Sequence, residues 1–205
     1  MQHDFILLDR SGSMQSLWAE ALNSVNAYVK KLAEDKVDTG VTLATFDKDG
    51  DEFKFEVIRD RIIPSTWTAV SDGDAAPRGM TPLNDAIGRI VALAKAGFNG
   101  APYDKLALIV MTDGLENASR EFSHAAAKAL LDECRAKNWQ IIFLGADFDN
   151  ALQAASYGNV AEASIAAPAR HLKELMEESA TLRARHAATA APMHYSEDVR
   201  RRLRE

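Results

Sequence analysis

The chain has 205 residues, a formal net charge of −6 and 47% hydrophobic residues, which predicts one soluble globular domain with an extension. Residues 1–167 hold 16 Lys/Arg against 24 Asp/Glu, and this acidic surface argues against a nucleic-acid partner. No stretch approaches about 18 consecutive apolar residues, no signal peptide is recognisable, and the single cysteine excludes an internal disulfide framework, which together indicate a cytoplasmic protein with no membrane partner.

The first half of the sequence alternates apolar runs with helical patterns. The predicted elements are a strand at 5–8, a helix at 15–34, strands at 40–46 and 53–58, and a helix from 82 to about 96. The turn signal DKDG (residues 47–50) and the alternating run FKFEVI predict a hairpin whose second strand is an antiparallel edge. Thr81 is the expected N-cap of the second helix, with Pro82 as its first residue.

The second half continues the alternation. Here the predicted elements are a central strand at 106–111, a helix at 119–137, a strand at 141–146, a helix at 150–157 and a weaker strand at 160–165. This order predicts an α/β fold, namely a Rossmann-like open sheet that is mostly parallel, with one antiparallel edge strand and helices on both faces. The domain is expected to span residues 1–167.

Residues 168–205 are predicted to form a C-terminal helical arm. Apolar residues recur at helical spacing from His171 onward, and Ser196 is the expected cap of a last, arginine-rich helix. The pattern leaves two alternatives open for this arm, which either packs back on the domain or extends towards a partner.

Oxygen-bearing side chains follow the first strand in the stretch FILLDRSGSM. Asp9, Ser11 and Ser13 occupy alternate positions, so an extended segment points them the same way, and Gly12 allows a tight turn. Asp113 follows the central strand and belongs to the same rim, because ligand sites of such sheets gather at the carboxyl ends of the strands. Carboxylate and hydroxyl oxygens are hard ligands that suit Mg²⁺, Mn²⁺ or Ca²⁺.

These residues resemble the pattern of the von Willebrand factor type A domain family, which carries the metal-ion-dependent adhesion site. That pattern is D-x-S-x-S, a distant Thr, and an Asp often followed by Gly. It is matched here by Asp9, Ser11, Ser13, Thr81 and Asp113, and the resemblance covers about residues 1–166.

The resemblance implies a non-catalytic, divalent-metal-dependent protein-binding module. The hydroxyls of Ser11, Ser13 and, in the ligand-bound form, Thr81 would contact the metal. Asp9 and Asp113 would act mainly through water or switch between direct and water-mediated contact, and an acidic side chain of a partner protein would complete the coordination. Among family members, an intracellular chain is similar to the bacterial and phage proteins. By analogy with these, the implied partners include an AAA-type ATPase system.

An enzyme is the main alternative, specifically a metal-dependent phosphohydrolase that uses the same oxygens. Asp9 after a first strand is typical of aspartate-nucleophile phosphatases, but these need a second carboxylate two residues on, where this chain has Ser11. The run DKDGD also has some features of a calcium loop, but it has Glu52 and Ile58 where an EF-hand needs Gly and Glu.

Three further features have both a functional and a structural interpretation. Trp67, in a loop, is a candidate aromatic for partner recognition, with packing as the alternative. Asp147 and Asp149 lie at the predicted rim and would shape the charge of the site, or cap the helix that follows. The arginines at 200–202 and 204 would form a solvated helix face or dock on an acidic patch.

Overall fold

A computed structural model describes residues 2–97, 105–145 and 148–204, without the side chains of 148–151 and 204. Its strands are β1 (Gln2–Asp9), β2 (Gly40–Asp49), β3 (Glu52–Ile62), β4 (Lys105–Met111), β5 (Gln140–Gly145) and β6 (Ser164–Ala166). Its α-helices are α1 (Trp18–Glu34), α2 (Leu83–Gly97), α3 (His124–Ala136), α4 (Phe148–Ser156), α5 (Leu172–Thr189) and α6 (Glu197–Arg204). None of these described helices combines the length and the apolar character needed to cross a membrane.

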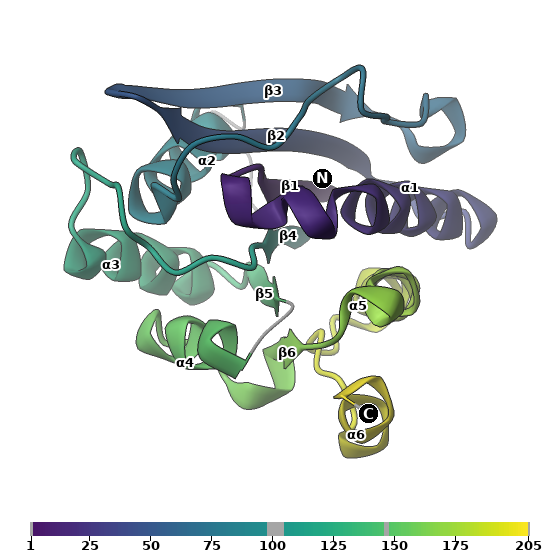
Figure 1. Cartoon of the computed structure of the whole chain (residues 1–205). Coiled ribbons are helices and arrows are strands. Elements are labelled where there is room, and N and C mark those ends of the chain that lie inside the picture. The colour runs from purple at the N-terminus through teal and green to yellow at the C-terminus, as the bar shows by residue number, and fades with distance from the viewer. Residues whose placement is uncertain (1, 98–104, 146–147, 205) are drawn as a thin grey trace.

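The six strands form one sheet in the order β3-β2-β1-β4-β5-β6 (Figure 1). All neighbouring strands pair in parallel except β3, which is antiparallel to β2. The predicted open, mostly parallel sheet with one antiparallel edge strand is confirmed. From β1 the chain adds β2 and β3 on one side, and it then returns to add β4, β5 and β6 on the other side. The strand order therefore reverses between β1 and β4. Ligand sites of such sheets lie at the carboxyl ends of these two strands.

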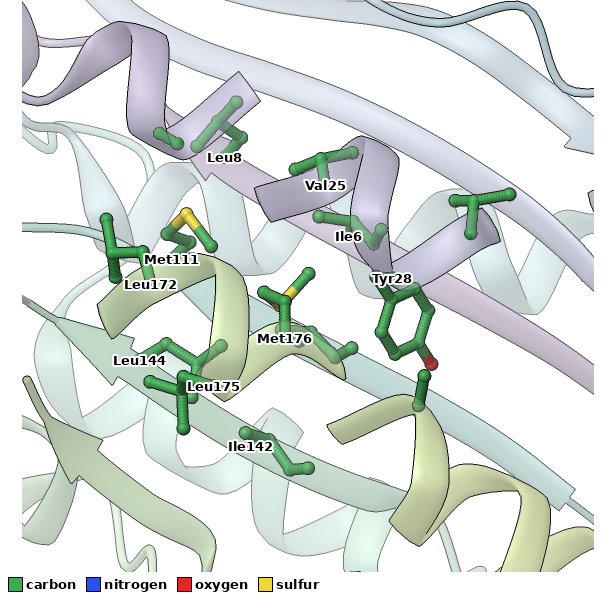
Figure 2. Close-up of a cluster of buried hydrophobic side chains, with 14 of the residues drawn as sticks. Ile6, Leu8, Val25, Tyr28, Met111, Ile142, Leu144, Leu172, Leu175 and Met176 are labelled. Atoms are coloured by element: carbon green, nitrogen blue, oxygen red, sulfur yellow. The ribbon is translucent and has the colours of Figure 1, made fainter. Parts of the chain in front are cut away.

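Helices cover both faces of the sheet, which explains why its central strands are continuously apolar (Figure 1). Along β1, Phe5 and Leu7 pack with residues of α2 and α3, whereas Ile6 and Leu8 pack on the opposite face. On that opposite face α1 and α5 lie together over β1, β4 and β5, and Tyr28 of α1 and Met176 of α5 point into the shared core (Figure 2).

The arm predicted at the C-terminus packs back on the sheet through α5. Leu172, Leu175 and Met176 are buried in the same hydrophobic cluster as Ile6 and Leu8 of β1. This settles the choice between a packed and an extended arm for α5, because these apolar residues would otherwise be exposed. The division of the chain after residue 167 stays a prediction.

Several element ends differ from the predicted ones. The hairpin turn is shifted to Gly50 and Asp51, the last residue of DKDG and the residue after it, since β2 continues to Asp49, which pairs with Glu52. The helix predicted at 119–137 begins only at His124, where Ser123 caps it by accepting from the amide of Ala126. The cause is long-range, because the carboxylate of Asp85 in α2 accepts from three amides of the preceding loop and holds it in a non-helical conformation. Ser196 caps α6 as predicted.

Candidate metal centre

The loop after β1 places two serine hydroxyls side by side above a buried aspartate. Asp9 is fully buried at the end of β1, and its Oδ1 accepts from the amide of Ser11 at 2.7 Å. A short 3₁₀ turn (Gly12–Ser16) follows and brings Ser11 Oγ and Ser13 Oγ within 3.0 Å of each other. Ser11 is buried and Ser13 is exposed, so the pair lies at the surface of the rim.

The loop after β4 is bonded to this first loop. Thr112 Oγ1 donates to the second carboxylate oxygen of Asp9, Oδ2, at 2.7 Å. Ser13 Oγ donates to Asp113 Oδ1 at 2.8 Å. These two bonds join the loops at the carboxyl ends of β1 and β4, where the strand order reverses.

Thr81 reaches the same place from the segment before α2. Its amide donates to Asn117 Oδ1 at 2.9 Å, and its carbonyl accepts from the amide of Asn117 at 3.1 Å. A Cβ atom built on Gly114 would lie 2.8 Å from Thr81 Oγ1 and 3.2 Å from Ser13 Oγ. The two hydroxyls therefore meet at Gly114, and a side chain there would push them away.

The sequence predicts Thr81 as the N-cap of α2, but in the structure other side chains cap this helix. The first free amides of the helix, at Asn84 and Asp85, donate to Glu116 Oε2 and Ser119 Oγ. Two side chains from the loop after β4 thus cap the helix, and the hydroxyl of Thr81 lies beside Gly114 instead.

Burial governs the acidity of both aspartates of the centre. It raises the pKa of Asp9 to about 6, against hydrogen bonds from Thr112 and Ser11 that lower it. Burial also raises the pKa of Asp113, against a hydrogen bond from Ser13. Desolvation thus destabilises both carboxylates, and a nearby cation would stabilise their ionised forms.

The donor set fits a hard divalent cation. In octahedral coordination with metal–oxygen distances of roughly 2.1 Å, neighbouring ligand oxygens are about 3.0 Å apart. The Ser11–Ser13 pair is separated by 3.0 Å and the Ser13–Asp113 pair by 2.8 Å. Across the described part of the chain, no three side chains of the His, Cys, Asp and Glu types group together as a metal cluster. A metal centre here would therefore depend on hydroxyls as well as on the two aspartates.

Sequence reasoning missed the residues that hold the loop after β4. The Glu116 carboxylate accepts from the amides of Ala118 and Ser119 as well as from α2. The Gln153 side chain of α4 accepts from the amide of Glu116 and donates to the carbonyl of Gly114. A carboxylate shortly before a helix is a capping signal, but nothing in the spacing indicates that its partner is α2.

Asp85 of α2 is a second missed residue. It is almost fully buried, and its carboxylate accepts from the amides of Arg120, Glu121 and Phe122. These three bonds explain why α3 begins later than predicted, since they hold the preceding segment against α2.

The remaining predicted features have structural roles. Asp47 of the DKDGD run is fully buried and bonded to Arg10 and Arg78, in a strand and not in a calcium loop. Trp67 is partly buried against the core and donates through Nε1 to Asn26 Oδ1 at 3.0 Å, which agrees with the packing interpretation. Arg202 of the C-terminal arginines pairs with Glu174 of α5 at 3.0 Å. Asp147 and the Asp149 side chain lie outside the described residues.

Comparisons with solved structures find the same fold in proteins of low sequence identity. A mussel byssus protein, proximal thread matrix protein 1, is 14% identical with a TM-score of 0.62, over 86% of this chain and 45% of that one. The pilus adhesin SpaC of Lactobacillus rhamnosus GG in an open conformation is 13% identical with a TM-score of 0.69, over 90% and 30%. Manganese-loaded TRAP protein of Plasmodium vivax is 14% identical with a TM-score of 0.57, over 86% and 72%.

The chain spans less than half the length of the first two of these proteins, and at such identities the likeness shows the fold alone. No curated protein sequence matches the chain. A family model of the von Willebrand factor type A domain matches residues 5–186, which include α5 as far as His186 and every residue of the candidate metal centre. The chain belongs to the von Willebrand factor type A domain family.

Proposed function

We propose that the chain is a divalent-metal-dependent protein-binding module. Its metal would be Mg²⁺, with Mn²⁺ or Ca²⁺ as alternatives, held by Asp9, Ser11, Ser13, Thr81 and Asp113. The observation that carries the proposal is the spacing of three oxygens from two loops, Ser11 Oγ, Ser13 Oγ and Asp113 Oδ1, at separations of 3.0 and 2.8 Å. These are the separations of neighbouring ligands around one small cation.

The contacts of the centre support a division of labour among its residues. Both carboxylate oxygens of Asp9 already accept hydrogen bonds, from the Ser11 amide and from Thr112. Asp9 is therefore suited to act through water and to orient the loop, while the neutral hydroxyls of Ser11 and Ser13 approach the cation directly. With few charged groups bound directly, the cation would keep its attraction for an additional anionic ligand.

The partner we propose is a protein that offers an Asp or Glu side chain. An open coordination position at the exposed Ser13 side of the centre would accept this carboxylate. One structural neighbour is a manganese-loaded protein and another is a pilus adhesin, which supports a binding role over catalysis. The phosphohydrolase alternative is not favoured, because the carboxylate that would serve as its general acid is missing and Ser11 stands at that position. An AAA-type ATPase partner, a cytoplasmic location and a bacterial or phage origin stay predictions.

A pull-down from native lysate tests the proposal. The wild type, Thr81→Ala and Thr181→Ala, an exposed threonine of α5 that serves as the matched control, are each used as bait with MgCl₂ or with EDTA. We expect partners that the wild type and Thr181→Ala retain in MgCl₂ and lose in EDTA, and that Thr81→Ala loses in both. Equal recovery by Thr81→Ala, or recovery that EDTA leaves unchanged, would refute the proposal. Phosphoester turnover that requires Mg²⁺ or Mn²⁺ and disappears in Asp9→Ala would favour the enzyme.

A further inference from the structure

We propose that Arg10, Asp47 and Arg78 form a clamp that positions Thr81 against the loop of Ser11 and Ser13, and so sets the affinity for the cation. We call these three residues the Asp47 clamp. The inference rests on the proposed function, since it assigns positioning residues to that metal centre. None of the three belongs to the matched family pattern, and none is a proposed ligand.

The clamp joins three separate segments by side-chain bonds. Arg10, which follows Asp9, donates through Nε and Nη2 to Asp47 Oδ1 at 3.1 and 3.0 Å. Arg78, three residues before Thr81, donates through Nε to the other oxygen, Oδ2, at 2.7 Å. One carboxylate of β2 thus binds the loop after β1 with one oxygen and the segment before α2 with the other.

Backbone bonds carry the position of the clamp to the metal centre. The Arg78 amide donates to the Arg10 carbonyl at 2.8 Å, and the Gly12 amide donates to the Gly79 carbonyl at 3.0 Å. Met80 and Lys48 exchange two backbone bonds, at 2.9 and 3.1 Å. The segment that ends at Thr81 is therefore laid along the end of β2 and along the D-x-S-x-S loop at the same time.

Gly79 shows how closely this segment is held. Its φ of 67° lies in the left-handed region, and a Cβ atom there would collide with the Lys48 carbonyl. The backbone between Arg78 and Thr81 therefore has one path, and a shift at the Arg78 end moves the Thr81 end.

Charge and burial suit the clamp to a fixed geometry. The Asp47 side chain is 0% exposed and that of Arg10 is 4% exposed, whereas that of Arg78 is 42% exposed. Arg10 also donates to Glu56 of β3 at 2.6 Å, so two positive and two negative groups balance. Removing Asp47 would leave Arg10 buried without its main partner and would unfold the region. Removing Arg78 leaves the Arg10–Asp47 pair intact, so Arg78 is the residue to change.

When Arg78 is replaced by a neutral residue, a purely electrostatic effect and the loss of the clamp would change the cation affinity in opposite directions. Arg78 is a positive charge close to a cation site, so its removal by charge alone would strengthen cation binding. If Arg78 acts by positioning Thr81, its removal weakens cation binding instead. Mutations of residues that orient metal ligands without touching the metal lower affinity by about tenfold or more.

The experiment measures the Mn²⁺ dissociation constant from the EPR signal of free Mn²⁺, with the thermal unfolding midpoint of each variant as a second readout. We expect Arg78→Gln to bind Mn²⁺ about tenfold more weakly, with its midpoint lowered by no more than about 4 °C. Arg78→Lys, which keeps one bond to Asp47, should recover most of the affinity. Glu56→Gln, which removes only the outer partner of Arg10, should bind as the wild type does.

A double-mutant cycle with Thr81→Ala identifies the route of the effect. In the Thr81→Ala background, Arg78→Gln should cause no further loss, because the positioned hydroxyl is already gone. Unchanged or tighter Mn²⁺ binding by Arg78→Gln, or a full tenfold loss that persists on Thr81→Ala, would overturn the clamp. If Thr81→Ala weakens binding and Arg78→Gln does not, the metal centre stands and the clamp fails. If the wild type shows no saturable Mn²⁺ binding, the proposed function is refuted, and the clamp is refuted with it.

Discussion

The replacement Arg183→Met should destabilise the protein more than any change to its surface ion pairs. Arg183 of α5 and Asp4 of β1 form an ion pair in which both side chains are 0% exposed. Arg183 also donates to Gln2 Oε1 and to the Lys105 carbonyl, each at 3.0 Å. Methionine matches much of the volume of arginine, but among the described residues it leaves the buried carboxylate of Asp4 with two hydroxyl donors, Tyr28 at 3.0 Å and Thr39 at 3.4 Å.

The expected loss follows from the burial of the pair. Breaking a fully buried ion pair from one side costs about 3–5 kcal/mol, since the remaining charge is left buried without an opposite charge. For a chain of this size, each kcal/mol lowers the thermal midpoint by roughly 2–4 °C. Arg183→Met should therefore lower the midpoint by about 6–20 °C. The double variant Asp4→Asn/Arg183→Met should lose less than the sum of its single changes, because neither charge is left alone.

Urea unfolding followed by circular dichroism measures the loss in free energy, and thermal unfolding measures the shift of the midpoint. Arg202→Met is the matched control. Arg202 pairs with Glu174 at 3.0 Å, but both side chains are about half exposed, and exposed pairs contribute about 0–1 kcal/mol. A loss in Arg183→Met that is no larger than the loss in Arg202→Met would refute the reasoning, and with it the role of the Asp4 pair in holding α5 on the sheet.

Three further outcomes are expected. Ala190→Gly should raise the free energy of unfolding by about 1 kcal/mol in a urea titration, because Ala190 ends α5 at φ 58°, a left-handed conformation that favours glycine; a decrease would contradict this. Gly114→Ala should weaken Mn²⁺ binding measured by EPR, since its Cβ would lie 2.8 Å from Thr81 Oγ1; unchanged affinity would contradict the placement of Thr81. His3 should contribute a fall of about 3 kcal/mol in the free energy of unfolding between pH 6.5 and 4, because burial lowers the pKa of folded His3 to about 4 while unfolded His3 binds a proton from pH 6.5 downward. Buried Asp9, with its pKa raised to about 6, contributes in the opposite direction, equally in the wild type and in His3→Gln. In urea titrations at several pH values, the free energy of unfolding of His3→Gln relative to the wild type should therefore rise as the pH falls, and a difference that does not change with pH would contradict this.

The sequence predicted the parts of the structure that follow from local pattern and from parallel alignment. β1 and β4 are recognisable because both of their faces are buried, which requires continuous apolar runs. Asp9 and Asp113 are separated by about a hundred residues, and their meeting follows from one rule, that neighbouring parallel strands end at the same rim. Both strands are confirmed, and their following loops are bonded to each other.

The rest depends on side chains that meet across long stretches of chain. From the local sequence, Asp47 is interpreted as a turn residue or a calcium ligand. Its partners, Arg10 and Arg78, lie 37 and 31 positions away, so the local pattern does not indicate them. The place of α5 was open because its apolar stripe suits either an intramolecular or an intermolecular contact. Arg183, which meets Asp4 across 179 positions, adds a specific contact to the apolar packing that holds α5 on this sheet.

The central claim is that three loops surround one cation, and the anomalous signal of manganese in crystals grown with MnCl₂ tests it most directly. We expect one strong peak within about 2.5 Å of the hydroxyl oxygens of Ser11 and Ser13, with Thr81, Asp9 and Asp113 around it. A map with no peak at this rim, or with its strongest peak at another place on the protein, would contradict the account.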